Sequence, residues 1–543
     1  MDLSRRQMLA SFLGLPAAVS ACKTARSLPE GKIVFPSQTL GHKLRDQAPP
    51  EIGPARFTRT GVVIVGGGVA GLSAAWRLRR AGFSDFVVLE LDPVVGGTAK
   101  SERSSVSAYP WGAHYITVPM KENRALIALL GEMGVIEGQE ASGEPVVREE
   151  VLCRDPQERL FHDGTWYEGL YLSAGASPQD KAELTAFRRE IDRWATMRDA
   201  RGRRAFAIPT AHSSPDAEVA SLDRISMAEW LTGHGWRSER LRWFVEYACR
   251  DDYGSTLEHT SAYAGVFYFA SRTGAGSEDT QPVITWPEGN GRLVNHLHAQ
   301  VHDNVRLGLA AADVAPFARD GQSGVEVVAV TVDGTASGFR ADQVIFAAPR
   351  FVAARVIRPW REAPPSFLAE FEYGAWMVAN LTLRDRPRSH GLRFAWDNVL
   401  YDSPSLGYVV ATHQRALDHG PTVLTYYYPL CDADPRAART RLLAAGWADW
   451  AEVALTDLSR AHPEIRDLCT RLDVMRWGHA MIRPRPGFMR SKALRDAAVP
   501  FRGVHFAHAD LSGVALFEEA FDHGLRAAEE VLAVRGLPFE GLR

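Results

Sequence analysis

The sequence predicts an α/β fold, and three stretches of the chain lead to that prediction. Residues 61–90 read as an apolar strand, a glycine-rich turn, a helix and a second apolar run that ends at an acid. Residues 305–349 hold alternating apolar residues around a turn at Asp333-Gly334, which is typical of a β-meander. Residues 503–534 read as a strand that ends in an acid, a turn, and a helix with one apolar side.

The glycines of the first stretch have the spacing of a dinucleotide-binding turn. Gly66-x-Gly68-x-x-Gly71 directly follows the apolar residues 62–65. The first glycine permits a tight turn, the second lets a pyrophosphate approach the main chain, and the third lets the helix pack on the strand. The N–H groups at the start of the helix then attract the phosphate. We therefore expect a Rossmann-type unit; the alternative interpretation is a glycine-rich turn without a ligand.

Glu90 narrows the choice of dinucleotide. It closes the second apolar run at roughly the twenty-residue spacing of an acid that binds a ribose 2′-hydroxyl. A 2′-phosphate would be repelled at this position, so the motif disfavours NADP. NAD and FAD both remain compatible with the motif alone.

The first residues read as an export signal. Residues 4–9 (SRRQML) resemble a twin-arginine signal, and the apolar stretch 8–21 that overlaps them is too short to span a bilayer. Residues 19–22 resemble a lipobox, which predicts a lipid anchor at Cys22 and a periplasmic location. The alternatives are an ordinary signal peptide and a coincidental cysteine. Residues 23–59 show no helical or strand periodicity and read as a linker.

Composition excludes several classes of protein. A chain of 543 residues is long enough for two domains. The net charge of −3 comes from mixed charges, with no basic patch for nucleic acid. Past the leader, the cysteines form no metal-binding cluster, so we predict no metal site. One disulfide and four unpaired thiols are both compatible with their positions, Cys153, Cys249, Cys431 and Cys469.

Further motifs resemble those of the FAD-dependent amine oxidase superfamily, which includes monoamine oxidases, phytoene desaturases and protoporphyrinogen oxidases. These motifs are a second glycine loop at residues 92–98, the segment 109–115, a glycine turn at 287–297, and the strand end at 503–510. They stand in the family's order over residues 59–537. The resemblance implies non-covalent FAD, because a nicotinamide domain needs neither the final segment nor the meander around Val314.

The resemblance also assigns roles to residues. It implies that the backbone of Val314 contacts adenine, that Asp510 binds the phosphoribityl chain, and that the last helix points at the flavin pyrimidine. Thr98 replaces the family's arginine, and Lys100 or Arg103 is the candidate for the missing charge. The full set of expected FAD contacts is Gly66, Gly68, Val69, Ala70, Gly71, Glu90, Gly97, Thr98, Gly112, His114, Tyr115, Val314, Ala348, Asp510, Leu516 and Phe517.

The implied architecture is a Rossmann-type FAD-binding domain with an interleaved α+β substrate domain. After the signal (residues 1–22) and the linker (23–59), the FAD-binding domain comprises residues 60–150, 285–350 and 475–537. The substrate domain comprises residues 151–284 and 351–474, and it includes helical patterns at 178–201 and 226–247.

Three positions depart from the amine oxidases of that family. Val378 stands where their lysine reaches flavin N5 through a water. Residues 477–481 contain no cysteine to hold FAD covalently, and Met481 falls where one cage tyrosine would stand. The other cage position falls near Leu516 or Phe517. These departures argue against a covalent flavin and against an aromatic amine cage.

We therefore predict an FAD-dependent oxidoreductase that abstracts a hydride from a C–H or C–N bond of a small apolar substrate, as a desaturase, dehydrogenase or isomerase does. O₂ or a membrane quinone would accept the electrons. The alternatives are a flavin-dependent amine oxidase and a non-catalytic flavin-binding partner protein. His479, and after it His114, is the candidate for proton transfer, although a structural role suits both. The aromatic residues 263–269 and 426–428 line either an apolar pocket or the ordinary core. The sequence predicts no oligomeric state.

Overall fold

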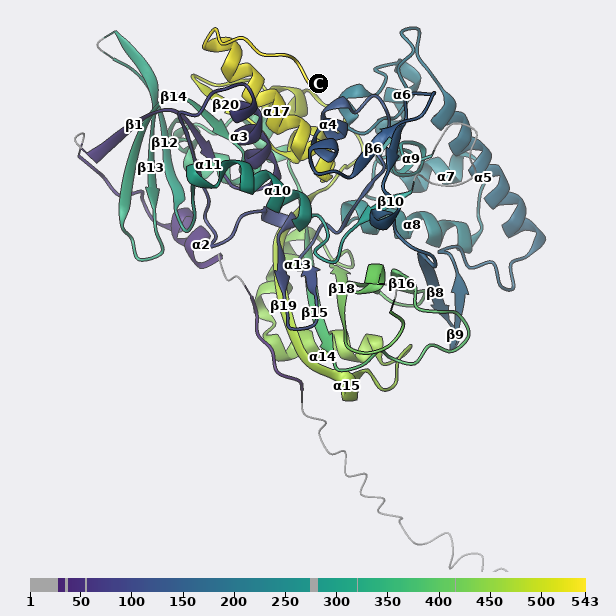
Figure 1. The fold of residues 1–543 in the computed structure, drawn as a ribbon. Coiled ribbons are helices and arrows are strands. Elements are labelled where there is room, and N and C mark those ends of the chain that lie inside the picture. Colours follow the sequence, from purple (N-terminus) through teal and green to yellow (C-terminus); the bar gives the residue numbers. More distant parts are fainter. Residues whose placement is uncertain (1–27, 35–37, 54–55, 274–281, 320, 416) are drawn as a thin grey trace, which may run out of the picture.

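The computed structural model describes residues 28–34, 38–53, 56–273, 282–319, 321–415 and 417–543 (Figure 1). The export signal predicted for residues 1–22, with the lipid anchor at Cys22, lies outside the described residues. In the part of the chain that is described, no helix combines the length and apolarity needed to cross a bilayer.

A mixed sheet forms the half of the molecule at the upper left of Figure 1. Strands β1, β2, β11, β14 and β20 run parallel to one another, and β12, β13 and β14 form the predicted antiparallel meander. The strand order is β11 (Val305–Arg306), β2 (Phe86–Leu89), β1 (Phe57–Val65), β14 (Ala336–Phe346), β13 (Gln322–Val330) and β12 (Ala310–Arg319), with β20 (Val504–Phe506) also paired to β14.

The longer helices pack on one side of β1 in this sheet, and shorter helices with apolar residues of the meander strands pack on the other side. Along β1, Val62 and Ile64 face the first group while Val63 and Val65 face the second, because successive strand residues point to opposite faces. Burial on both faces explains why β1 reads as a continuous apolar run. The first group is α3 (Val69–Arg80), α4 (Arg124–Glu132), α10 (Gly291–Val301) and α17 (Phe517–Val534); the second includes α11 (Arg350–Val356), α12 (Arg358–Glu362) and α16 (Lys492–Ala497).

A second sheet forms the lower part of the molecule in Figure 1. Helices α13 (Pro435–Ala444), α14 (Trp447–Leu458) and α15 (Ile465–Leu468) cover one of its faces. Tyr426 and Tyr428 point to these helices, whereas Tyr427 points to the opposite face. The strand order is β19 (Cys469–Ile482), β15 (Tyr373–Leu383), β18 (Thr422–Pro429), β17 (Tyr408–Val410), β16 (Asp397–Leu400), β8 (Glu158–His162) and β9 (Thr165–Glu168).

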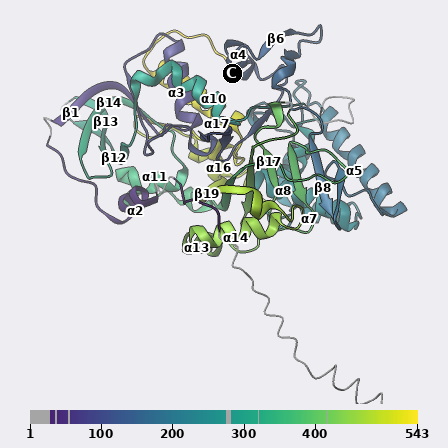
Figure 2. The ribbon, with the colours of Figure 1, turned by 60° about the horizontal axis from the view of Figure 1, so that its bottom comes forward.

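A helical region completes the substrate half, at the right of Figure 1, and Figure 2 shows α8 beside β8. The helical pattern predicted at 178–201 corresponds to one helix that ends at residue 196, and the pattern predicted at 226–247 is divided between two helices, residues 227–233 and 239–253. The helices of this region are α5 (Pro178–Thr196), α6 (Ala217–Ser221), α7 (Met227–Gly233), α8 (Glu239–Tyr253) and α9 (Ala262–Ala270). The remaining short strands pair as β3 (Ser101–Arg103) with β4 (Ala108–Pro110), β5 (Tyr115–Thr117) with β10 (Val283–Thr285), and β6 (Ile136–Gln139) with β7 (Pro145–Val147).

The predicted domain ranges can be compared with the positions of the strands in the sequence. The first sheet draws its strands from residues 57–89, 305–346 and 504–506, so it begins three residues before the predicted domain at 60. Strand β19 continues through the predicted boundary at 475 as far as Ile482. The exact boundaries therefore stay predictions.

Part of the predicted linker has regular structure. Residues 28–34 pair in parallel with β19, where Leu472 N donates to Glu30 O at 2.8 Å and Val474 N donates to Lys32 O at 2.9 Å. Helix α2 (Gln38–Asp46) then buries Leu40 among apolar residues of the meander. These two segments, which we call the N-terminal strap, therefore contact both halves of the molecule. No apolar pattern marks this pairing in the sequence, because the pairing uses backbone groups.

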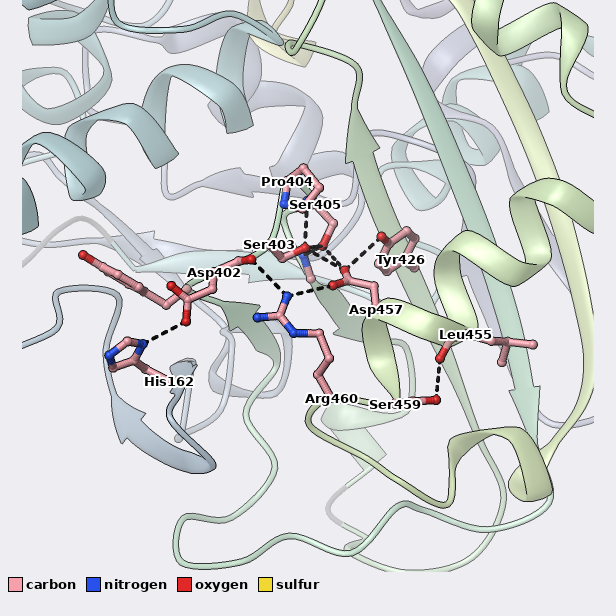
Figure 3. A network of polar contacts seen from close by, with 12 residues as sticks. His162, Asp402, Ser403, Pro404, Ser405, Tyr426, Leu455, Asp457, Ser459 and Arg460 are labelled. Atoms are coloured by element: carbon pink, nitrogen blue, oxygen red, sulfur yellow. Dashed lines mark hydrogen bonds and ion pairs between the residues drawn. The ribbon is translucent and has the colours of Figure 1, made fainter. Parts of the chain in front are cut away.

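A buried polar network fixes the loop that follows β16 (Figure 3). The carboxylate of Asp457 on α14 accepts hydrogen bonds from the hydroxyls of Ser403 and Ser405, each at 2.7 Å, and from Tyr426 on β18 at 3.0 Å. Three donors on one carboxylate satisfy a group that would otherwise be costly to bury. The network thus holds together the loop, α14 and β18.

The cysteines past the leader form no disulfide with one another in the described chain. Burial raises the pKa of all four thiols, and a thiol with a raised pKa is a poor nucleophile. The structure thus has four unpaired thiols, one of the two readings that the sequence allowed.

Candidate cofactor and substrate site

The glycine turn leaves the start of α3 open to an anion. Gly66, at φ +104°, makes the turn that only glycine adopts without strain. Gly68 is the N-cap of α3 and offers no side-chain hydrogen bond to the helix. A Cβ placed on Gly68 would meet nothing closer than the Cα of Gly97 at 3.9 Å. The N–H groups of the first helical turn, at Val69 and Ala70, therefore adjoin free space that suits a pyrophosphate.

Glu90 lies directly beneath this turn. Its carboxylate accepts hydrogen bonds from Gly67 N at 2.7 Å and from Asp92 N at 2.8 Å. Burial raises its pKa, which the two N–H donors and Lys100 oppose. A carboxylate has about four acceptor positions, so two remain for ribose hydroxyls.

Lys100, one candidate for the family's missing positive charge, is already paired. Its ammonium group forms a buried ion pair with Asp92 and lies 5.5 Å from the ring centre of Trp477. Arg103, the other candidate, is exposed. The positive charge of Lys100, which could have replaced that of the family's arginine at Thr98, is therefore largely neutralised by Asp92.

The carboxyl ends of the parallel strands meet at one edge, where α/β sheets bind their ligands. Ala348, which follows β14, lies against the turn: its N would be 3.3 Å from a Cβ on Gly66. Asp510, which follows β20, accepts hydrogen bonds from Tyr373 Oη at 2.6 Å and Arg350 N at 2.9 Å. Burial opposes the ionisation of Asp510, but His508 and these donors lower its pKa overall. Asp510 is therefore ionised, at the position where the phosphoribityl chain of FAD is predicted to bind.

Val314 lies fully buried on β12, where it bridges to Ile357. The residue just before β12, Leu309, donates its N–H to Glu90 O at 2.8 Å. The start of this strand thus lies beside the acid of the glycine turn. The adenine contact itself stays a prediction.

A large cavity joins this edge to the substrate half. Its volume, which includes open solvent, is about 900 Å³. Six predicted FAD contacts line it, namely Thr98, Gly112, His114, Tyr115, Leu516 and Phe517. The structure therefore brings together residues that lie more than 400 positions apart in the sequence.

The positions that depart from the amine oxidases also line this cavity. Val378 on β15 and Met481 on β19 are both part of its wall, as is Leu516. The cavity therefore has no lysine at the first position and no tyrosine cage. Aromatic residues in its wall include Trp376, Trp477 and Tyr427, of which Tyr427 belongs to the aromatic segment 426–428 noted in the sequence.

The two candidate histidines differ in position. His479 is exposed, stacks on Phe351 with ring centres 4.1 Å apart, and does not line the cavity. His114 lines the cavity, and its ring stacks on Tyr427 with centres 4.9 Å apart. Burial lowers the pKa of His114 to about 4. Its Nδ1 lies 3.3 Å from Gly112 O and donates to it, so Nε2 of the neutral ring is an acceptor.

Carboxyl groups were not predicted in the cavity wall, yet Asp251, Asp252 and Glu518 all line it. The opposing cation is Arg272, whose guanidinium donates to Asp252 at 2.6 Å. Glu518 is 6% exposed, and no other described residue donates a hydrogen bond to it. Burial raises the pKa of Glu518 to about 7. Burial, with the neighbouring Asp252, raises that of Asp251 to about 8.

A second cavity of about 610 Å³, again including open solvent, adjoins the first. The two share His114, Tyr115, Thr117, Asp251 and Arg272 in their walls. The second adds Glu158 from β8 and Asp397 from β16, so we call it the acidic compartment. Its aromatic wall is formed by Tyr247, Tyr268, Phe269 and Trp396.

The residues at the strand edge fit FAD. The open helix start, the acid under the turn and the ionised Asp510 match a pyrophosphate, a ribose and a ribityl chain in that order. Asn290 adds a further point of contact: its Oδ1 is buried in the wall of the large cavity without a hydrogen-bond partner. The fold and the site thus define a Rossmann-type flavoprotein with a separate substrate half.

Comparison with known proteins identifies the family. The family described as flavin-containing amine oxidoreductase matches residues 69–532. The chain belongs to this family, and FAD is its cofactor. This confirms the predicted fold class and cofactor, and it agrees with the predicted oxidoreductase class.

Individual relatives are more distant. A stretch of 90 residues is 43% identical to the peroxisomal N(1)-acetyl-spermine/spermidine oxidase of Bos taurus, and it covers 16% of this chain and 17% of that protein. A variant of putrescine oxidase has a similar fold, with a TM-score of 0.63 at 18% identity, covering 88% of this chain and 100% of the other. A fatty acid isomerase from P. acnes has a TM-score of 0.59 at 15% identity, covering 87% and 98%. Because amine and fatty acid enzymes share this fold, the fold alone does not fix the substrate.

Proposed function

We propose that the protein oxidises a positively charged amine by removing a hydride from the carbon next to its nitrogen. The observation that carries the proposal is the excess of acids in the wall of the large cavity, where three carboxyl groups stand against one guanidinium. Buried carboxylates are costly unless a cation neutralises them, so such a wall favours an ammonium group over an apolar substrate. This selects the amine oxidase, which the sequence offered as an alternative, over the desaturase-like function.

The aromatic walls suit the rest of an amine. Trp376 and Tyr427 are buried on neighbouring strands and offer flat apolar faces to a carbon chain. An aromatic face also attracts a cation, by about 0.5 to 2 kcal/mol. We infer that these rings position the carbon while the carboxyl groups hold the nitrogen.

FAD, when bound, accepts the hydride and thus supplies the redox chemistry. The ammonium must first lose a proton, because only a neutral nitrogen has the lone pair that assists hydride loss from its carbon. Asp251 is the proposed acceptor of that proton: an ammonium group bound beside it favours its ionised form, and its pKa, raised to about 8 by burial, brings its proton affinity nearer to that of an amine. His114 has far lower proton affinity, and its neutral Nε2 is a hydrogen-bond acceptor for the substrate nitrogen.

The named relatives support an amine substrate. The names of two relatives contain spermine, spermidine and putrescine. All three amines carry positive charge at neutral pH. O₂ or a membrane quinone remains the proposed electron acceptor. Export by the twin-arginine route and anchoring in the periplasm through Cys22 are proposals that rest on the sequence of the leader.

The test is reduction of the flavin in the purified holoprotein without oxygen. Positively charged amines should bleach the visible flavin band, and uncharged alcohols or alkenes of the same length should not. Asp251→Asn should slow bleaching by roughly a hundredfold or more, the usual scale for loss of an acid–base group. Asp163→Asn is the matched control, because Asp163 lies in an exposed turn outside both cavities.

Two results would contradict the proposal. Bleaching by an apolar substrate and by no amine would restore the desaturase-like function. A flavin that no substrate reduces would favour the non-catalytic partner protein.

A further inference from the structure

We propose that the acidic compartment is a subsite for a second positively charged group of the substrate, so that the protein prefers di- or polyamines to monoamines. The inference rests on the proposed function and deepens it. A monoamine needs only the large cavity, and the carboxyl groups of Glu158 and Asp397 line only the acidic compartment.

The acidic compartment holds two carboxyl groups, those of Glu158 and Asp397, with which no described cation pairs. The carboxyl group of Glu158 has no hydrogen-bond partner among the described residues, and burial alone raises its pKa to about 7. Asp397 accepts a hydrogen bond from Tyr247 Oη at 3.0 Å, a neutral donor. Arg272, the cation in the wall, already pairs with Asp252. Glu158 and Asp397 therefore lack a positive partner.

These carboxyl groups face the compartment. Glu158, Asp251 and Asp397 all line it and keep part of their surface accessible, although each lies deep in the protein. They come from β8, α8 and β16. Glu158 raises the pKa of both Asp251 and Asp397, and Asp251 also raises that of Asp397. Three separate elements thus direct acids into one space next to the substrate cavity.

The spacing of the acids favours an organic cation over a metal ion. Among the described residues, the group whose ligand atoms all lie within 4.8 Å of one another is the exposed set His162, Asp163 and Asp402. Glu158, Asp251 and Asp397 do not meet that limit, so they are too far apart to share one small ion. An ammonium group on a flexible carbon chain does not require three ligand atoms so close together.

The other walls also suit a diamine. Tyr247, Tyr268 and Trp396 line the compartment with aromatic rings, which attract cations and contact methylene groups. The compartment joins the large cavity along His114, Tyr115 and Asp251. One amino group can therefore lie in each cavity, with the carbon chain along the shared wall.

Flavin reduction gives the first test. Putrescine and spermidine should have a KM at least tenfold below that of n-butylamine, since a buried charged hydrogen bond is worth roughly 1.5 to 3 kcal/mol. Glu158→Gln and Asp397→Asn should raise the KM for putrescine about tenfold. Because Glu158 also raises the pKa of Asp251, kcat is compared on its high-pH plateau, where both variants should leave kcat for putrescine and KM for n-butylamine nearly unchanged. Asp163→Asn is again the control; Asn tolerates the left-handed backbone at that position, φ 48°.

Binding without turnover gives the second test. Holoprotein reduced by dithionite oxidises no amine, so calorimetry can measure binding of putrescine, n-butylamine and Mg²⁺ separately. Putrescine should bind at least tenfold more tightly than n-butylamine, and Glu158→Gln should remove that difference.

The two proposals fail in different ways. If amines reduce the flavin but mono- and diamines behave alike in both tests, the subsite is overturned while amine oxidation stands. If no amine reduces the flavin, amine oxidation fails, and the calorimetry still decides whether the compartment binds a diamine. Binding of Mg²⁺ that depends on Glu158, without putrescine binding, would overturn the subsite in favour of a metal.

Discussion

At the scale of single residues, Gly71 is the most constrained position of the cofactor turn. A Cβ there would lie 1.8 Å from the carbonyl oxygen of Gly66, which is backbone and cannot rotate away. We predict that Gly71→Ala shifts α3 from the strand, costs at least about 3 kcal/mol and releases FAD. The ratio of flavin to protein absorbance and the melting temperature measure both effects.

Gly41→Ala is the control for this variant, because a Cβ on Gly41 in α2 would meet nothing within 4 Å. Its stability should change by less than about 1 kcal/mol, in the direction expected for alanine in a helix. Full FAD content in Gly71→Ala would show that the packing of helix on strand does not hold the cofactor turn.

At the scale of elements, the N-terminal strap depends on one close backbone contact. A Cβ on Gly31 would lie 1.8 Å from Leu472 O on β19, and 2.6 Å from the indole nitrogen of Trp447 on α14. We predict that Gly31→Ala detaches residues 28–34 from β19 and lowers stability by about 1 to 3 kcal/mol. Limited proteolysis should then cut between residues 28 and 50 faster than in the parent protein. Unchanged cleavage there would contradict the role assigned to this contact.

Helices and strands could be predicted where a short stretch of sequence contains the whole pattern of apolar residues and glycines. Strand β1 and helix α3 form a continuous stretch whose apolar run and glycine spacing are visible in one window of sequence. The pairing of residues 28–34 with β19 joins segments more than 400 positions apart and uses main-chain groups, so no side-chain pattern marks it. The same reasoning explains why Glu90 was predictable and the acidic compartment was not.

At the scale of the whole molecule, the substrate site is assembled from distant parts of the chain. Glu158, Asp251 and Asp397 lie on three elements with about 90 to 150 residues between consecutive members. The Asp251-Asp252 doublet is visible in the sequence, but acids at the end of a helix are usually exposed, and nothing local marks these as buried. His479 looked promising because the family places its substrate cage nearby, yet the side chain faces outward.

The acidic compartment should make stability depend on pH and on amine. Burial raises the pKa of Glu158 from 4.5 to about 7, so the folded protein holds a proton there that the unfolded chain has lost. Stability therefore falls as pH rises from about 4.5 to about 7, and the loss is complete above that range. A diamine that pairs with the ionised carboxylate of Glu158 should restore the stability that is lost at high pH.

Glu158→Gln removes this titration. Without amine, the variant should be more stable than the parent by on the order of 1 to 3 kcal/mol at about pH 8, with little difference at about pH 5. Putrescine should raise the melting temperature of the parent at about pH 8 and have a smaller effect on the variant. Melting curves at both pH values, with and without putrescine, measure this. An equal difference between the two proteins at both pH values would mean that Glu158 does not titrate within the compartment, and that the substitution acts through packing alone.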